Sequence, residues 1–180
     1  MNDSIIWTVG HSNRPIAQLI GLLTGQPISV LADVRRFPGS KRQPQFAQES
    51  LESSLREVGI GYRHFEALGG RRSRSREDSP NTARRSESFH AYADHMQTSE
   101  FQAVLAELMA LAVSSPTAIL CAEAVPWRCH RQLIADALVA HGWEVRHILG
   151  VRRIQPHRLT EFARVVQGQV TYPGQTKTNE

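Results

Sequence analysis

The sequence predicts an α/β fold in which a mostly parallel sheet of about five strands lies between two layers of helices. Three observations predict it. Short apolar runs rich in β-branched residues alternate with segments whose apolar residues recur at helical spacing. Loop sequences such as FPGSKRQP separate these segments. The 180 residues are 41% hydrophobic, which suits one domain with a core of its own.

Two strands and two helices are predicted before residue 60. Ser12 or Asn13 is expected to cap the first helix, because their side-chain oxygens can accept a free N–H, and Pro15 suits the first turn. The second helix is expected to stop at Gly59. The segments are a strand at 5–9, a helix through Ile16, Leu19, Ile20 and Leu23, a strand at 29–34, a loop at 37–44, and a helix through Leu51, Leu55 and Val58.

The alternation continues in the second half of the chain. Residues 69–88 are polar, aperiodic and basic, and we interpret them as a mobile loop. Ser99 and Gln102 are spaced as a capping box. A single α/β domain is expected over 1–168, followed by a tail at 169–180. The further segments are strands at 61–66, 117–123 and 144–149, and helices through Phe89, Tyr92 and Met96, through Phe101, Val104, Leu105, Leu108 and Met109, and through Leu133, Ile134, Ala137 and Leu138.

Composition narrows the class of protein. The formal net charge is +4, and it comes from arginine, because only Lys41 and Lys177 are lysines. Arginine suits phosphate and carboxylate recognition, although a codon bias of the genome would also explain its excess. No apolar run is long enough to span a membrane, and the start MNDSIIWTVG lacks the layout of a signal peptide. Two cysteines cannot form a disulfide framework, so we expect a cytoplasmic protein without membrane contact.

Polar residues follow three of the predicted strands at the point where each strand ends. In open parallel sheets, ligands bind beyond the carboxyl ends of the strands, so these residues predict a site. The candidates are Gly10, His11 and Ser12 after the first strand, Asp33 and Arg35 at the end of the second, and Cys121, Glu123, Arg128, Cys129, His130 and Arg131 at the end of the fourth.

Each residue of the first two groups has a structural and a functional interpretation. Gly10 either turns the chain tightly or admits the close approach of a ligand. His11 and Ser12 lie near a helix N-terminus, which favours an anion, although Ser12 more simply caps the helix. Asp33 and Arg35 are two residues apart and share a face of an extended segment. They form a structural ion pair, or Asp33 orients Arg35 towards a ligand.

The segment CAEAVPWRCHR, residues 121–131, concentrates reactive side chains. If the helix already runs there, His130 falls in the middle of its apolar face, as a core histidine or as a residue that faces the cleft. Cys129 lies near a helix N-terminus beside arginines, so a lowered pKa is expected. Adjacent helical residues do not face each other, so we expect His130 to be a poor base for Cys129. Cys121 is expected to be an inert core thiol.

Glu123 is interpreted either as a general acid or base or as an ion-pair partner of Arg128 or Arg131. A phosphatase-type phosphate loop is disfavoured, because Arg128 follows Cys121 by one residue too many and Pro126 removes an N–H donor. A zinc site would lack closely paired cysteines, so no metal is predicted.

Five segments together carry a family resemblance: TVGHSN, ADVRRFPGSKRQPQF, YRHFEALGGRR, FHAYADHM and CAEAVPWRCHRQLIADAL. In this order they resemble a bacterial and archaeal family catalogued as family 488 of the domains of unknown function. The resemblance implies a three-layer α/β fold and assigns no activity or cofactor. The motif positions that it picks out are His11, Ser12, Asp33, Arg35, Pro38, Phe46, Tyr62, Leu68, Gly69, Gly70, Tyr92, Cys121, Glu123, Cys129, His130 and Arg131.

The leading functional hypothesis is an enzyme-like domain that binds a small anionic, phosphate-bearing ligand at the carboxyl edge of the sheet. One alternative is a nucleic-acid-binding module that uses the arginines of the basic loop between 71 and 85. The other is a thiol redox protein. In the leading hypothesis the catalytic candidates are His11, Glu123, Cys129 and His130, and the ligand-binding candidates are Gly10, Ser12, Asp33, Arg35, Arg128 and Arg131.

Overall fold

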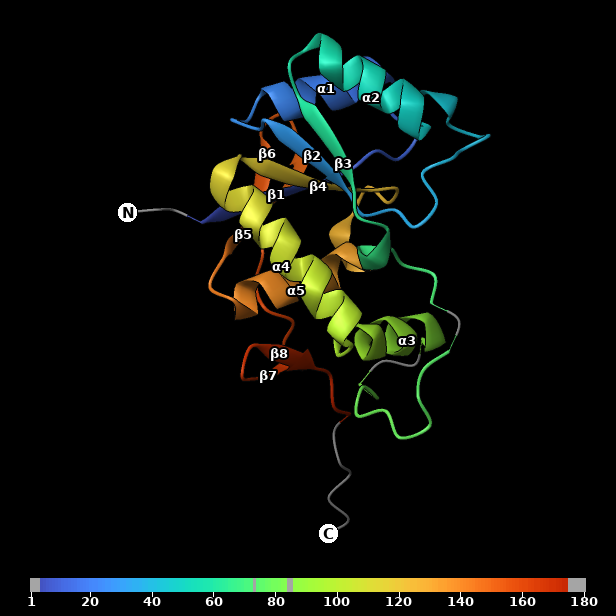
Figure 1. Cartoon of the computed structure of the whole chain (residues 1–180), viewed down its shortest axis with the longest axis vertical. Helices are drawn as coiled ribbons and strands as arrows, with labels where there is room; N and C mark the ends of the chain where they lie inside the picture. Colours follow the sequence, from blue (N-terminus) through green and yellow to red (C-terminus); the bar gives the residue numbers. More distant parts are fainter. Residues whose placement is uncertain (1–3, 73, 84–85, 175–180) are drawn as a thin grey trace.

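A six-stranded sheet runs through the centre of the protein, whose computed structural model describes residues 4–72, 74–83 and 86–174 (Figure 1). Its strands are β1 (Ile5–Gly10), β2 (Val30–Asp33), β3 (Gly61–His64), β4 (Thr117–Cys121), β5 (Glu144–Gly150) and β6 (Arg153–Pro156). The spatial order is β3-β2-β4-β1-β5-β6, and neighbours are parallel except β5 and β6, which are antiparallel. The predicted α/β fold with a mostly parallel sheet is confirmed.

Helices cover both faces of this sheet (Figure 1). They are α1 (Ile16–Thr24), α2 (Gln48–Glu57), α3 (Glu87–Met96), α4 (Ser99–Ser114) and α5 (Arg131–Ala140). Helices α1 and α2 pack on one face, and α4 and α5 pack on the other, with α3 against α4. Within the described part of the chain, no helix is long and apolar enough to cross a membrane.

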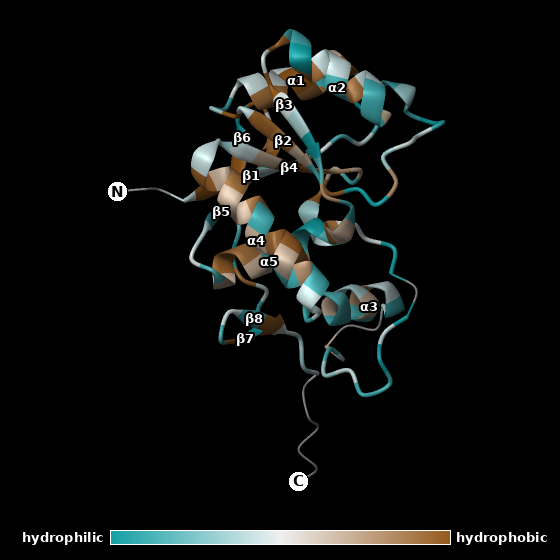
Figure 2. Ribbon diagram, viewed as in Figure 1, coloured by the Kyte–Doolittle hydropathy of each residue, from teal (hydrophilic) through white to brown (hydrophobic). Residues whose placement is uncertain are grey.

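The central strands alternate their side chains between two cores. In β1, Trp7 and Val9 enter the core beneath α1 and α2, whereas Ile6 enters the core beneath α4 and α5. Each fully buried side chain of this size contributes about 1.5–3 kcal/mol relative to an exposed one. The central strands are accordingly brown in Figure 2, and the segment between β3 and α3 is mostly teal and white.

The chain leaves β1 and β4 towards opposite sides of the sheet. From β1 the chain passes β4 to reach β2, and from β4 it passes β1 in the opposite direction to reach β5. The two strands end side by side, since Gly10 is opposite Cys121 and the N–H of His11 donates to the carbonyl of Cys121 at 3.0 Å. Open α/β sheets bind ligands at such a switch point. The topology therefore places the predicted site residues where a ligand site is expected.

The C-terminal part departs from the prediction. Strands β6, β7 (Arg164–Val166) and β8 (Gln169–Thr171) were not expected, and the domain boundary set at 168 falls inside the β7–β8 hairpin. Tyr172 is fully buried, and its hydroxyl donates to Asp136 at 2.8 Å. The predicted tail is therefore wrong for residues 169–174, and residues 175–180 lie outside the described residues. Three-residue strands are too short to show a period.

Two helix caps also differ from the prediction. Helix α1 begins after Pro15 without a side-chain cap, and Ser12 instead has a left-handed φ of 49°. Helix α4 is capped by Thr98, one residue before the predicted position, whose hydroxyl accepts the N–H of Phe101 at 3.2 Å. Gln102 donates to the carbonyl of Met96 at 2.7 Å, so it forms no reciprocal capping box with Ser99.

Candidate functional site

Two cavities at the carboxyl edge of the sheet share one wall. Their volumes are about 360 Å³ and about 290 Å³, and both are lined by Gly70, Arg71, Glu123, Cys129 and His130. We call this pair of cavities the edge cleft. Its further lining consists of Arg35, Arg36, Phe37, Gly39 and Ala122 on one side and Ser86, Ser88, Phe89, Tyr92, Trp127, Arg128, Gln132 and Leu133 on the other.

Cys129 and His130 face each other in this shared wall, although they are consecutive. The Cys129 Sγ lies 3.3 Å from Nδ1 of His130. The contact is possible because Cys129 has an extended backbone, with φ −137° and ψ 153°, and helix α5 begins only at Arg131. The expectation that His130 is turned away from Cys129 is therefore wrong, since it treated both residues as helical.

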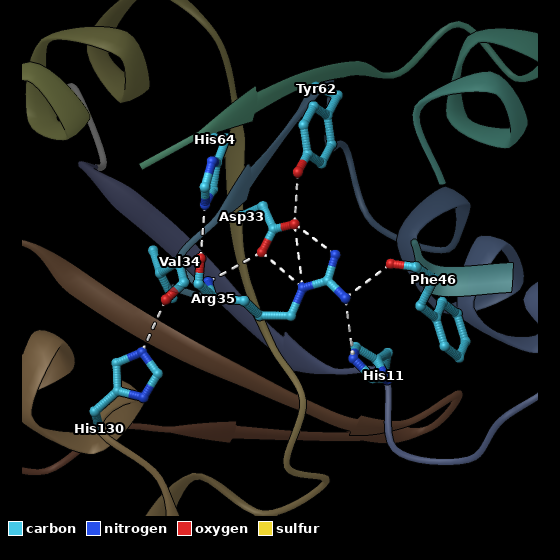
Figure 3. A network of polar contacts seen from close by, with 8 residues as sticks. All are labelled: His11, Asp33, Val34, Arg35, Phe46, Tyr62, His64 and His130. Carbon is cyan, nitrogen blue, oxygen red and sulfur yellow. Dashed lines mark hydrogen bonds and ion pairs between the residues drawn. The ribbon is translucent and has the colours of Figure 1, made fainter. Parts of the chain in front are cut away.

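The backbone of Val34 fixes the tautomer of His130. The Nε2–H donates to the carbonyl of Val34 at 3.0 Å, so Nδ1 carries the lone pair that faces Cys129 (Figure 3). Burial, the largest cause, and the nearby positive charges of Arg131 and Arg72 lower the pKa of His130 to about 4. His130 is therefore a neutral hydrogen-bond acceptor near neutral pH.

Helix α3 helps to hold Gly70 against the imidazole of His130. Tyr92 donates to the carbonyl of Leu68 at 2.7 Å, and His95 donates to that of Ala67 at 2.6 Å, so the segment before Gly70 is held from two sides. A Cβ at Gly70 would lie 2.9 Å from Nδ1 of His130. The sequence therefore needs glycine here for the ring to keep its position.

The thiols of Cys121 and Cys129 shift each other's pKa, while the Cys121 Sγ itself lies 3.5 Å from the carbonyl oxygen of Glu123. Burial raises the pKa of Cys121, but the neighbouring Cys129 thiol and the charge of Arg131 outweigh burial and lower it. The neighbouring Cys121 thiol and burial raise the pKa of Cys129. The lowered pKa expected of Cys129 is therefore wrong, whereas Cys121 is the core thiol that was expected, since it is fully buried.

Arg131 is fully buried beneath the loop that follows β4. Its Nη2 donates to the carbonyls of Glu123 and Ala124, each at 3.2 Å. Its Nε and Nη1 have no hydrogen-bond partner among the described residues. A guanidinium stays charged even when buried, so Arg131 holds this loop and places a positive charge beside Cys121. It lines neither cavity of the edge cleft.

Asp33 and Arg35 form a buried ion pair, which is one of the two roles that the sequence predicts for them (Figure 3). Arg35 Nη2 lies 2.6 Å from Asp33 Oδ2, and Arg35 Nη1 donates to the carbonyl of Phe46 at 2.8 Å. Tyr62 donates its hydroxyl to Asp33 Oδ2 at 2.6 Å, and burial together with this bond raises the pKa of Tyr62. The charge of Arg35 is thus neutralised within the protein, although its side chain borders the cleft.

His11 belongs to the same buried network. Its Nδ1–H donates to the carbonyl of Ser12 at 2.8 Å, and its Nε2 accepts from Arg35 Nη1 at 3.4 Å. The ring stacks on Phe46 with centroids 4.4 Å apart, and burial lowers the pKa of His11. Both ring nitrogens are engaged and His11 lines neither cavity, so the structure does not place it to exchange a proton with a ligand in the edge cleft.

Gly10 accommodates the chain's own backbone. A Cβ at Gly10 would lie 1.7 Å from the carbonyl oxygen of Glu123, which leaves no room for any other residue. Gly10 therefore permits the close approach of the loop that follows β4 and not that of a ligand. Ser12 and Asp33 also lie outside the lining of the edge cleft.

The charged side chains of the edge cleft that have no ion pair are mostly positive. Arg36, Arg71 and Arg128 line it, and in the described part of the chain none of them lies within ion-pair distance of a carboxylate. Arg36 reaches across to donate to the carbonyl of Arg71 at 2.6 Å. Glu123 is exposed, and its carboxylate likewise has no cationic partner among these residues. Neither Arg128 nor Arg131 is thus its ion-pair partner.

Sequence reasoning named Arg128 and considered Arg71 only as part of the basic loop. It missed Arg36, which follows the buried Arg35 directly. The sequence does contain a signal for Arg36. Side chains alternate between the two sides of an extended segment, so the residue that follows the buried Arg35 is expected to face outward.

The basic loop is tied to the rest of the protein at several points. Arg72 donates to the carbonyls of Ala67 and Gly69 at 2.9 Å and 3.2 Å, and the N–H of Arg76 donates to Asp94 at 2.7 Å. Two of its arginines, at 84 and 85, lie outside the described residues. Across residues 4–72, 74–83 and 86–174, no group of three or more His, Cys, Asp or Glu side chains is placed to hold a metal ion.

Comparison with known proteins gives one match. The model of the family described as "Domain of unknown function DUF488" matches residues 15–138, which is more than half of the chain. This range includes the whole of the shared wall of the edge cleft. No curated protein and no solved structure matches the chain.

Proposed function

Because this chain belongs to the DUF488 family, whose description assigns no activity, we propose its function from the site itself. The protein is an enzyme that binds a small phosphate-bearing ligand in the edge cleft and attacks it with the thiol of Cys129. One observation carries this proposal: the Cys129 Sγ lies 3.3 Å from the neutral Nδ1 of His130 in the wall that both cavities share. A nucleophile within reach of a base that a third group orients is the arrangement of nucleophilic catalysis.

The chemical step follows from this geometry. The Cys129 thiol passes its proton to Nδ1 of His130 while the sulfur bonds to an electrophilic centre of the ligand. The bond to the leaving group breaks, and the leaving group takes the proton from Nδ1. Water then attacks the covalent intermediate and restores the thiol. The bond from His130 Nε2–H to Val34 keeps the ring in the tautomer that this step needs.

The ligand is held by charge. Arg36, Arg71 and Arg128 offer guanidinium groups that no carboxylate within the described part of the chain neutralises, and such groups bind phosphate through paired hydrogen bonds. The anion-binding role expected of Arg35 and Arg131 passes to these three. Glu123 is the acidic side chain of the lining and is available to exchange a proton with the leaving group or with water.

Alkylation of the thiols tests the proposal. Iodoacetamide is expected to modify Cys129, whereas the fully buried Cys121 stays unmodified in the folded protein. Inorganic phosphate is expected to slow this modification, because it occupies the cleft. His130→Gln removes the base and is expected to slow the reaction by about tenfold or more near neutral pH. The rate is measured by mass spectrometry of the peptide that contains Cys129.

Control variants separate the loss of phosphate binding from a general effect of losing an arginine. Arg36→Gln with Arg128→Gln is expected to abolish protection by phosphate, while Arg56→Gln, at an exposed site on α2, leaves it unchanged. If His130→Gln alkylates as fast as the wild type, or if phosphate protects neither protein, the proposal is wrong.

A second candidate, a thiol redox protein, is favoured by the closeness of the Cys121 and Cys129 thiols, each of which shifts the pKa of the other. In this case hydrogen peroxide takes two electrons and two protons from the two thiols, which become a disulfide, and is itself reduced to two molecules of water. Oxidation with peroxide would then remove two hydrogens from the protein mass, reversibly with dithiothreitol. Two free thiols after this treatment would eliminate the candidate.

A further inference from the structure

A third cavity continues the edge cleft along the rim of the sheet. Its volume is about 380 Å³, and it shares Trp127 and Gln132 with the adjoining cavity of the cleft. Arg158, the buried His147 and the half-buried His157 also line it, together with Pro126, Gln155 and Pro156. We call the edge cleft and this third cavity together the rim groove. The rim groove is thus longer than a single phosphate needs.

Two exposed aromatic rings stand in the rim groove. Phe37 is 62% exposed and Trp127 is 46% exposed, and every other Phe, Tyr or Trp of the described residues is buried or half-buried. Phe37 lines the cavity at one end, and Trp127 stands between the other two cavities. Apolar rings of this size normally contribute to a core, so their shared position in one groove points to a ligand with flat aromatic groups.

Positive charge accompanies both rings. The guanidinium of Arg36 lies 5.3 Å over the ring of Phe37, and Arg128 follows Trp127 in sequence. With Arg71 and Arg158, four arginines without an ion pair in the described part of the chain line the groove, against one acidic residue. Alternating arginines and exposed rings are the features by which proteins bind a single strand, with phosphates on the cations and bases stacked on the rings.

We propose that the ligand of the rim groove is a single-stranded nucleic acid, bound with bases on Phe37 and Trp127 and phosphates on the arginines between them. A duplex does not fit this arrangement, because its bases are already stacked on each other. Two rings in separate cavities require at least two bases, so an oligonucleotide fits better than a mononucleotide. The inference rests on the proposed function for the chemistry at Cys129, but binding itself does not need the thiol.

Fluorescence anisotropy with a labelled single-stranded oligonucleotide of mixed sequence tests this inference. Phe37→Ala and Trp127→Ala are each expected to weaken binding by about tenfold or more, and Trp127→Phe is expected to retain it, because any flat ring can stack. Val113→Ala, which truncates a side chain that is 73% exposed on α4, is the matched control and leaves the affinity unchanged. Circular dichroism checks that each variant is folded.

Salt dependence tests the arginines. Arg36→Gln with Arg128→Gln is expected to reduce the slope of log affinity against log salt by about 1.4, or about 0.7 for each lost phosphate contact on a single strand. Arg56→Gln leaves the slope unchanged. Equal affinity for a duplex of the same sequence or for a mononucleotide, or no binding at low salt, would overturn the inference.

The variant Cys129→Ser separates this inference from the proposed function. It is expected to bind the oligonucleotide like the wild type while losing the alkylated peptide. If the oligonucleotide does not bind but phosphate still protects Cys129 from iodoacetamide, the ligand class is wrong and the thiol site stands. If the oligonucleotide binds but His130→Gln alkylates at the wild-type rate, the groove is a nucleic-acid site and the thiol chemistry is wrong.

Discussion

Replacing Gly70 with alanine tests how tightly the protein holds the imidazole of His130. The new Cβ would lie 2.9 Å from Nδ1, 3.3 Å from Cγ and 3.4 Å from Cε1 of that ring. The ring cannot retreat freely, because its Nε2–H is bonded to Val34 at 3.0 Å and it packs at an angle of 56° against the ring of Tyr92, with centroids 5.2 Å apart. A shift of the ring therefore also disturbs its 3.3 Å contact with Cys129.

The cost of this substitution is that of overpacking a closely packed site, about 1–3 kcal/mol of unfolding free energy. The loss or weakening of the hydrogen bond to Val34 contributes about 0.5–1.5 kcal/mol of it. Urea denaturation measures the change in stability, and iodoacetamide measures the reactivity of Cys129, which is expected to fall together with the stability.

Gly39→Ala is the matched control, because Gly39 also lines the edge cleft and a Cβ there meets no atom within 4 Å. Its expected effect is within about 0.5 kcal/mol. If Gly70→Ala is as stable and as reactive as Gly39→Ala, the imidazole is not held in the way described.

The remaining predictions concern the buried polar groups and Gly10. Asp33→Asn leaves the guanidinium of Arg35 buried without its charged partner. It is expected to lower the unfolding free energy, measured in urea, by about 3–5 kcal/mol. A loss under about 1 kcal/mol would contradict this prediction. Burial, the largest cause, and the charges of His157 and Arg131 lower the pKa of His147 to about 3. The unfolded chain therefore binds protons below about pH 6.5 that the native His147 does not, so stability is expected to fall between about pH 7 and about pH 5. Urea denaturation at the two pH values measures this, and His147→Asn is expected to show a smaller decrease. Gly10→Ala places a Cβ 1.7 Å from a backbone oxygen and is expected to prevent stable folding, which circular dichroism would reveal; a folded variant of wild-type stability would contradict the close approach.

Much of the fold could be predicted because its central elements carry long, regular patterns. The run 5–9 corresponds to β1 (Ile5–Gly10), and the helical spacing that begins at Ile16 corresponds to α1 (Ile16–Thr24). The second helix does stop before Gly59, which has a φ of 75°. The hairpin β7–β8 escaped prediction, because its strands are short and one of them, β7 (Arg164–Val166), is wholly exposed. The hairpin is instead held by the buried side chain of Tyr172, which contacts Asp136, a residue that lies far from it in the sequence.

The site was harder to predict than the fold, because it depends on where one helix begins. Arg131 is the first residue of α5, and the preceding Cys129 is extended after a short 3₁₀ turn at Pro126–Arg128. A shift of the helix start by two residues decides whether Cys129 and His130 point apart or meet. Composition alone also could not show that Arg35 is neutralised by Asp33, whereas the next residue, Arg36, remains available to a ligand.

The contact between the thiol of Cys129 and a neutral His130 is the feature on which the proposed chemistry depends. Nuclear magnetic resonance of the ¹⁵N-labelled imidazole measures its tautomer and its titration directly. The structure predicts the Nε2–H form, unprotonated down to about pH 4, with a change in the Nδ1 signal on Cys129→Ser. A ring in the Nδ1–H form, or one that titrates near about pH 6.5 and ignores the loss of the thiol, would contradict it.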